Sequence, residues 1–290
     1  MRLGAALLVL LLASPASAAL DPPAWTEPTP PFRIVGNIYY VGSKGLAAYL
    51  IATPRGLILL DGTMAENVPQ IERSIAALGF RLRDIKLLLN SHAHFDHAAG
   101  LAQLKRDSGA AMLASREDRQ ALETGRPPSL TNYGLVTFPP VKVDRLVVDG
   151  RPVRLGSVAM TPLHTPGHTP GCTTWMTTAK ERGRTLKIVF PCSLTVAGNL
   201  LVGNTGYPGI VADFRRSFLR VAAFRADIVL PGHPEGVDLH GRHARRISGD
   251  ISAFLMPGLL PRMTDDARSA FEAELARQQA QPTISSGLKK

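Results

Sequence analysis

Ser-His-Ala-His-Phe-Asp-His at residues 91–97 decides how the fold and chemistry of this 290-residue chain are interpreted. The stretch follows an apolar run at 85–89, so we expect it on the loop that ends a buried strand, where open sheets commonly place their functional groups. It holds three histidines and one aspartate within six residues. Imidazole and carboxylate are ligands of zinc in hydrolytic sites, so the stretch predicts a metal centre rather than a polar loop facing solvent.

The spacing within this stretch predicts how its side chains share metal ions. Residues two apart in an extended segment project to the same side, so His92 and His94 can hold one ion. Asp96 and His97 begin the following helix, where they can face a second ion close to the first. Such ligand sets leave a coordination position open for water or substrate, as hydrolytic zinc sites require. We therefore expect two Zn²⁺ per chain.

Two further histidines lie in loops that also end apolar strands. His168 occurs in Gly-His-Thr-Pro-Gly at 167–171, and His233 occurs in Pro-Gly-His-Pro at 231–234. Glycine and proline on both sides make these turns stiff, which limits the entropy lost when a metal binds. We interpret both imidazoles as metal ligands.

The remaining histidines are interpreted as having other roles. The surroundings of His164 nearly repeat those of His168, and we assign His164 a structural or supporting part. His240 and His243 lie among arginines on a predicted helix, so we expect both to be solvated.

These motifs resemble those of the metallo-β-lactamase superfamily, and within it those of subclass B3. The resemblance runs from about residue 31 to the C-terminal helix. It rests on His-Ala-His-Phe-Asp-His-Ala-Ala-Gly at 92–100, Gly-His-Thr-Pro-Gly at 167–171 and Tyr-Pro-Gly-Ile-Val-Ala-Asp-Phe-Arg at 207–215. By matching position, it implies that the first zinc is held by His92, His94 and His168. It implies that the second zinc is held by Asp96, His97 and His233.

The segment after the strand expected at 186–190 discriminates among the hydrolases of this superfamily. Lactonases and thioesterases of the superfamily carry an aspartate there that bridges the metals, whereas this chain continues Pro-Cys-Ser-Leu-Thr. The resemblance to subclass B3 implies that Ser193 contacts the carboxylate of a bound β-lactam, with Thr195 either helping it or closing a turn. Cys192 is reminiscent of another subclass with a cysteine ligand. That subclass lacks the histidine found here at His97, so Cys192 is not needed as a metal ligand.

The resemblance implies a zinc-dependent β-lactamase, and hence antibiotic resistance through hydrolysis of penicillins, cephalosporins and carbapenems. Zinc lowers the pKa of a bound water to about 7, so we expect zinc-bound hydroxide to attack the lactam carbonyl. Asp96 is the expected catalytic residue, because it can orient that nucleophile or relay its proton. The alternatives are a lactonase or thioesterase of the same fold, an iron-dependent oxidoreductase on the same scaffold, and a binding protein without activity.

The order of predicted elements favours a single domain at 32–290, after an extended proline-rich arm at 19–31. Each half contains strands, a helix, a further strand and a histidine loop. Two facing sheets with helices outside satisfy this pattern, and this αββα sandwich is also the fold that the resemblance implies. We expect strands at 34–41, 48–52, 57–60, 85–89, 145–148, 158–163, 173–177 and 186–190, and helices at 67–78, 211–224, 242–254 and 265–280.

Asp61 follows the strand expected beneath the metals. A carboxylate there could orient metal ligands and fix imidazole tautomers. It could equally begin a turn before Gly62.

Cys172 and Cys192 are the only cysteines. The family's usual disulfide near the C-terminus therefore cannot form. Export would permit a bond between these two, which lie on neighbouring predicted strands, and we hypothesise that it forms.

The first 18 residues have the pattern of a cleavable signal sequence, with Arg2, an apolar stretch at 7–12 and a small-residue cleavage site that ends at Ala18. We therefore expect a periplasmic or secreted monomer without a membrane anchor. Removal of Arg2 leaves 32 basic and 23 acidic residues, a net charge of +9. The basic residues are scattered without interleaved aromatics, so we expect no nucleic-acid partner. The charge could attract anionic β-lactams, but a solvated surface without a role explains it as well.

Overall fold

The computed structural model describes residues 21–132 and 134–281, so the predicted signal sequence lies outside the described residues. Its strands form two mixed sheets. The first sheet, in spatial order, contains β1 (Phe32–Val35), β2 (Ile38–Tyr40), β3 (Tyr49–Thr53), β4 (Gly56–Leu60), β5 (Ile85–Leu89), β6 (Ala111–Ala114) and β7 (Arg145–Leu146). The second contains β12 (Ile228–Val229), β11 (Arg184–Phe190), β10 (Thr173–Glu181), β9 (Val158–His164) and β8 (Val153–Leu155).

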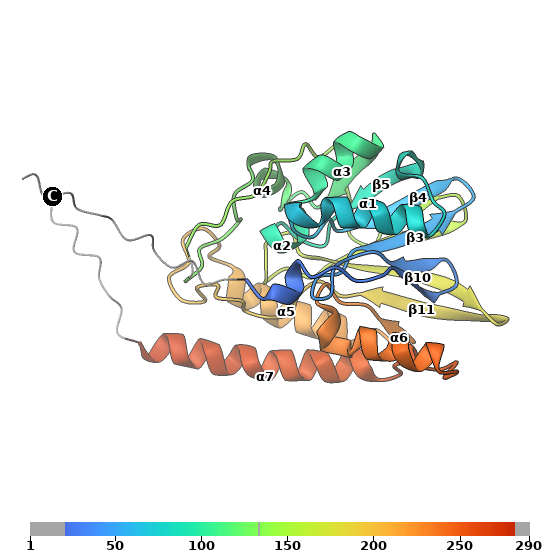
Figure 1. The fold of residues 1–290 in the computed structure, drawn as a ribbon. Coiled ribbons are helices and arrows are strands. Elements are labelled where there is room, and N and C mark those ends of the chain that lie inside the picture. The colour runs from blue at the N-terminus through green and yellow to red at the C-terminus, as the bar shows by residue number, and fades with distance from the viewer. Residues whose placement is uncertain (1–20, 133, 282–290) are drawn as a thin grey trace, which may run out of the picture.

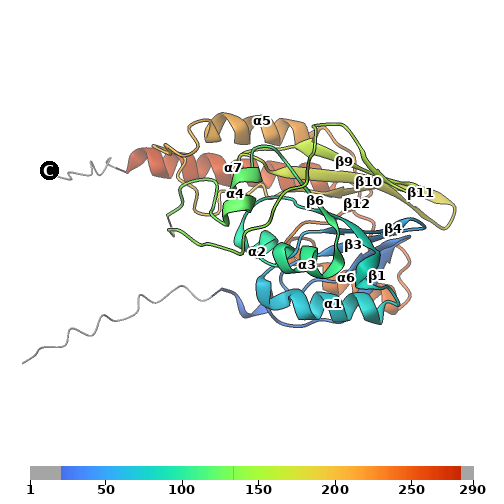
Figure 2. The ribbon, with the colours of Figure 1, turned by 90° about the horizontal axis from the view of Figure 1, so that it is seen from above.

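Helices cover the outer face of each sheet (Figure 1). α1 (Val68–Ala77) and α3 (Leu101–Ser108) pack on the first sheet, and α5 (Ile210–Ala222) and α7 (Leu259–Ala280) pack on the second. Figure 2 shows α1 and α7 on opposite sides of the sheets. The shorter helices are α2 (Phe95–Ala98), α4 (Arg119–Thr124) and α6 (Leu239–Ile247), with 3-10 helices at Pro23–Trp25, Ala65–Asn67, Leu82–Asp84 and Pro234–Val237. The predicted αββα sandwich is confirmed.

Three apolar layers hold the sandwich together. The central layer lies between the sheets and contains Tyr49, Ile51 and Trp175. Leu50, between two of these residues on β3, belongs instead to the layer under α1 and α3. Successive residues of a strand point to opposite faces, so the first three residues of β3 are buried on both sides of the sheet. The third layer joins the second sheet to α5 and α7.

Three predicted elements have wrong boundaries, each for a local reason. The strand expected at 34–41 is a hairpin, because the chain turns at Gly36, whose φ of +51° favours glycine. The helix expected at 242–254 is α6, which ends before Gly249. α7 begins at Leu259 rather than 265, since Pro261 falls in its first turn, where proline is tolerated.

The N-terminal arm is not wholly extended. Pro23–Trp25 forms a 3-10 turn, and the carbonyl of Trp25 accepts hydrogen bonds from Ser43 Oγ at 2.7 Å and Asn67 Nδ2 at 2.8 Å. Both donors are buried and need an acceptor, so the arm satisfies polar groups of the loop after β2 and of the 3-10 helix before α1. Among the described helices, none has the length and apolar character needed to span a bilayer.

The hypothesised disulfide between Cys172 and Cys192 is confirmed. The two Cα atoms lie 5.8 Å apart, and the residues are separated by 20 positions. The bond joins the chain just before β10 to the chain just after β11, next to the loop of His168 and next to Ser193. It therefore fixes the segment that carries a predicted ligand against the segment predicted to bind substrate.

Removal of this disulfide by the double substitution Cys172→Ser and Cys192→Ser should lower the free energy of unfolding by about 3 kcal/mol, because a closed loop of this length restricts the unfolded chain by about that amount. Denaturant unfolding of the two proteins measures the difference. Reductant should destabilise the wild-type chain but not the double variant. Two free thiols in denatured, unreduced wild-type protein would contradict the assignment.

Candidate metal centre

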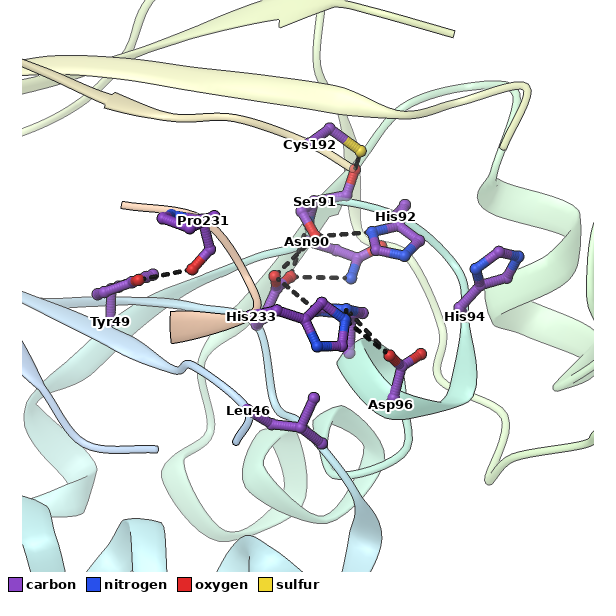
Figure 3. Close-up of polar contacts among 12 residues, drawn as sticks. Leu46, Tyr49, Asn90, Ser91, His92, His94, Asp96, Cys192, Pro231 and His233 are labelled. Carbon is purple, nitrogen blue, oxygen red and sulfur yellow. Dashed lines mark hydrogen bonds and ion pairs between the residues drawn. The ribbon is translucent and has the colours of Figure 1, made fainter. Parts of the chain in front are cut away.

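The structure brings the six predicted ligands together at one edge of the sandwich. His92 and His94 lie on the loop after β5, and Asp96 and His97 lie on α2, which follows directly. His168 follows β9 and His233 follows β12. In Figure 3, the side chains of His92, Asp96 and His233 gather from these loops around one space. Strand ends of both sheets therefore contribute to one site, as expected when functional loops meet at one edge.

One group of three imidazoles consists of His92, His94 and His168. His168 Nε2 lies 3.1 Å from His92 Nε2 and 3.0 Å from His94 Nδ1. Two nitrogens bound to one tetrahedral zinc ion are about 3.3 Å apart, given zinc–nitrogen bonds of about 2.0–2.1 Å. The spacing of these nitrogens therefore fits a shared zinc ion.

Hydrogen bonds behind this group select the imidazole tautomers. Ser91 Oγ donates to Asp61 Oδ2 at 2.7 Å and therefore accepts from His92 Nδ1 at 3.0 Å. His168 Nδ1 donates to the carbonyl of Thr195 at 2.8 Å. His92 and His168 thus carry their protons on Nδ1 and present the lone pairs of Nε2 to the site, which is the form needed for metal binding, whereas His94 faces the group through Nδ1.

A second group consists of Asp96, His97 and His233. Asp96 Oδ2 lies 3.2 Å from His97 Nε2 and 3.3 Å from His233 Nε2, and the two nitrogens are 3.4 Å apart. Three donor atoms at nearly equal separations surround one point, again at the spacing that tetrahedral zinc requires. Both donor sets therefore fit zinc by ligand chemistry and by separation.

The two groups differ in charge. Burial lowers the pKa of His94 to about 4, and burial with neighbouring imidazoles lowers the pKa of His92 and His168 well below the usual value. These three side chains are therefore neutral at pH 7. Burial also acts to lower the pKa of His97, but the carboxylates of Asp96 and Asp61 outweigh it and raise that pKa to about 10. Metal binding at the second group must therefore displace a proton from His97.

Asp61 has the supporting role that the sequence left open. Its carboxylate is buried and accepts hydrogen bonds from the backbone N–H of Ser91 at 2.7 Å and from Asn90 Nδ2 at 3.1 Å. Asp61 Oδ2 also lies 3.5 Å from His97 Nδ1. Its φ of +63° is unusual for a residue other than glycine, and such strain commonly occurs beside functional sites. The Asp61 carboxylate therefore lies beside His97 of the second group and holds Ser91, which in turn orients His92 of the first group.

A cavity of about 290 Å³ opens onto the ligands. Its lining includes His92, His97 and His233 as well as Ser193 and Thr195. The hydroxyls of Ser193 and Thr195 are 3.0 Å apart. α7 also lines the cavity and contributes Leu260, Met263, Asp266 and Ala267, most of which are apolar. A small molecule with an apolar body and an anionic group fits such a lining.

Sequence reasoning missed two residues near the site. Trp25 of the N-terminal arm lies with its ring 5.5 Å from that of His233. Asp118, which directly precedes α4, is buried against the loop after β5 and the loop after β9. Burial raises the pKa of Asp118 to about 6, although its three hydrogen bonds act in the opposite direction. The apolar run at 110–114 was the only signal for Asp118, since it marks a strand whose end meets the same edge.

The three other histidines stand apart from the two ligand groups. His164 ends β9 and its Nε2 lies 3.5 Å from Glu117 Oε2. The prediction that His240 and His243 are solvated is wrong, because both are half-buried. His243 stacks on Phe32 with ring centroids 3.9 Å apart, and His240 Nε2 donates to the carbonyl of Lys44 at 2.9 Å. The neighbouring arginines indicated an exposed helix, so the sequence did not predict this packing.

Comparison with known proteins places this fold and site in a family. Residues 45–233 match the metallo-beta-lactamase superfamily. The subclass B3 metallo-beta-lactamase BJP-1 of Bradyrhizobium japonicum is 42% identical, with a TM-score of 0.85, over 89% of this chain and 98% of that one. MEM-A1, a subclass B3 metallo-beta-lactamase from a soil metagenome library, is 39% identical, with a TM-score of 0.84, over 89% and 100%. The metallo-beta-lactamase FEZ-1 of Legionella gormanii is 38% identical, with a TM-score of 0.84, over 88% and 98%. The chain therefore belongs to subclass B3 of the metallo-β-lactamase superfamily.

Proposed function

We propose that this chain is an exported dizinc hydrolase that opens the β-lactam ring of penicillins, cephalosporins and carbapenems. The observation that carries the proposal is the meeting of two complete ligand groups with Ser193 at one cavity. The solved relatives named as metallo-beta-lactamases support it. The signal pattern at 1–18 supports delivery to the periplasm or the medium, where such antibiotics act.

The first zinc would be held by His92, His94 and His168, and the second by Asp96, His97 and His233. Bound zinc supplies Lewis-acid activation of water and of a carbonyl at neutral pH. Burial acts to raise the pKa of Asp96, but the imidazoles of His97 and His233 have the larger effect. Together they hold that pKa well below its usual range. The Asp96 carboxylate therefore stays ionised and can accept a hydrogen bond from the attacking water, which orients its lone pair toward the carbonyl.

The remaining residues of the cavity position the substrate. Ser193 and Thr195 can donate hydrogen bonds to the carboxylate of a β-lactam, while the apolar wall of α7 contacts its substituents. The segment after β11 holds no carboxylate between Pro191 and Thr195. A hydroxyl in this place suits an anionic substrate, because an aspartate would repel the substrate's carboxylate.

Hydrolysis of a substrate panel tests the proposal. The purified, zinc-loaded chain should open penicillin, cephalosporin and carbapenem rings and leave acyl-homoserine lactones and glutathione thioesters nearly untouched. Because the reaction uses no serine nucleophile, inhibitors that acylate a catalytic serine should have little effect. The reverse substrate preference would reject the β-lactamase while leaving a dizinc hydrolase in place.

Ser193→Ala should lower kcat/KM about tenfold to a hundredfold, chiefly through KM, because a hydrogen bond to a charged group contributes about 1.5–3 kcal/mol in ground and transition states alike. Steady-state kinetics with a penicillin measures the loss. The matched control is the methyl ester of the same penicillin, which lacks the carboxylate charge. The variant and the wild-type chain should hydrolyse the ester at similar rates. Equal kcat/KM values on the free acid would remove Ser193 from the site.

A further inference from the structure

Asp118 occupies the position before α4 where an aspartate commonly caps its own helix, yet its side chain makes no such hydrogen bond. Its carboxylate turns instead toward the two loops that carry the imidazole group. Oδ2 accepts hydrogen bonds from the backbone N–H of Ala93 at 3.0 Å and from Thr169 Oγ1 at 2.7 Å. Oδ1 accepts from the backbone N–H of Gly171 at 2.8 Å. All four residues are buried or lie in buried loop segments.

The positions of these donors link Asp118 to three ligands at once. Ala93 separates His92 from His94, and Thr169 follows His168 directly. One carboxylate therefore joins the loop after β5 to the loop after β9. The joint is tightly packed, because a Cβ atom added at Gly171 would lie 2.6 Å from Asp118 Cγ and 2.0 Å from Ser115 Oγ.

The free-energy cost of burying the Asp118 carboxylate indicates that this side chain does more than stabilise the fold. Among the described residues, the groups that act on the Asp118 carboxylate are Thr169, the backbone of Ala93 and Gly171, and Glu117, and none of them is a cation. A buried carboxylate without a cation is costly to desolvate, and hydrogen bonds offset that cost only in part. Its geometric effect is to fix the separation of His92 and His94 from His168. Groups that hold ligands in place in this manner commonly change metal affinity when they are removed.

We propose that Asp118 is a positioning residue that sets the separation of the two histidine loops and thereby the zinc affinity of the group His92, His94 and His168. The inference rests on the proposed function in one respect, because it requires that the wild-type chain binds zinc. It concerns neither the substrate nor the reacting atoms, so it can be tested without measuring β-lactam hydrolysis.

Asp118→Asn tests the proposal with nearly unchanged volume. Asparagine offers one acceptor oxygen and one NH₂ group, so the N–H of Ala93 or that of Gly171 must face a donor. One loop then loses its anchor. The affinity for Zn²⁺ should fall about 10–100-fold, measured by competition with a chromophoric chelator. The visible spectrum of the Co²⁺ form should change as well. Both measurements use the Asp96→Ala background, in which only the first group is complete.

Ser115→Ala is the matched control. It removes the hydrogen bond from the backbone N–H of Asp118 to Ser115 Oγ at 3.2 Å, in the same buried loop, but removes no hydrogen bond to either of the two loops that Asp118 joins. Unfolding of the metal-free proteins should show that both variants lose stability, whereas zinc affinity should fall in Asp118→Asn alone. Equal affinity losses in the two variants, or wild-type affinity in Asp118→Asn, would overturn the proposal.

A second variant keeps the inference testable if Asp118→Asn does not fold. Thr169→Val preserves shape and removes the hydroxyl that donates to Asp118 Oδ2, so zinc affinity should fall about threefold to tenfold, the effect of losing one hydrogen bond of about 1 kcal/mol. Unchanged affinity in Thr169→Val would also count against the proposal. A wild-type chain that binds no zinc would reject the proposed function itself.

Discussion

Asp96→Ala should lower kcat for β-lactam hydrolysis on the order of 10²–10⁴-fold, because it removes both a predicted metal ligand and the carboxylate that orients water. The zinc content of the dialysed protein should fall from two ions to about one per chain, since the second group loses its only anionic donor. Elemental analysis and steady-state kinetics on the same preparation measure both quantities. Chelation of the wild-type enzyme should abolish turnover, and added zinc should restore it.

Asp265→Ala provides the control for Asp96→Ala. Asp265 is exposed on α7, where its carboxylate pairs with Arg268 at 3.1 Å. Its loss should leave zinc content and turnover unchanged, because exposed pairs contribute little. Full zinc occupancy together with full turnover in Asp96→Ala would show that the second group is assigned wrongly.

Trp175→Ala should lower the free energy of unfolding by about 3–5 kcal/mol, because it empties the centre of the core between the sheets. Trp175 is fully buried, and its Nε1 donates to the carbonyl of Asn90 at 3.0 Å. Asn90 directly precedes the ligand loop, so the substitution removes a support of the site as well as apolar contacts. Denaturant unfolding should be measured with a chelator present, since metal binding would otherwise add to the stability.

Two comparisons separate the contributions to this loss. Trp175→Phe should lower the free energy of unfolding less than Trp175→Ala, because it keeps most of the apolar volume. Its remaining cost is about 1–3 kcal/mol, because one buried carbonyl is left without a donor. Trp25→Ala, at the half-buried tryptophan of the arm, should also cost less than Trp175→Ala. A loss below about 1 kcal/mol for Trp175→Ala would contradict the central position assigned to this side chain.

The ligand loops were predictable because their information is local. His92, His94, Asp96 and His97 lie within six residues, and glycine or proline marks the loops of His168 and His233. Each loop follows a short segment with the pattern of a strand, and strand ends of an open sheet meet at one edge. The αββα architecture followed from the same alternation of strands, helices and loops.

What the sequence did not predict depends on contacts between distant segments. Asp118 lies 25 positions from Ala93 and 53 from Gly171, and an aspartate before a helix normally indicates only a cap. The two possible roles of Asp61 were separated only by its bonds to Ser91, 30 positions away. The stacking of His243 on Phe32 joins the two ends of the chain. Such pairings leave no periodic pattern in the sequence.

The position of α7 has a consequence for the order in which this protein can mature. One wall of the cavity belongs to this helix, which follows every predicted ligand in the chain, and His233 itself comes after the last strand of the second sheet. A nascent chain that ends before β12 lacks a member of the second group and a side of the pocket. The second group can therefore be completed only when synthesis is nearly finished, and a chain that crosses a membrane unfolded would complete this group only on the far side.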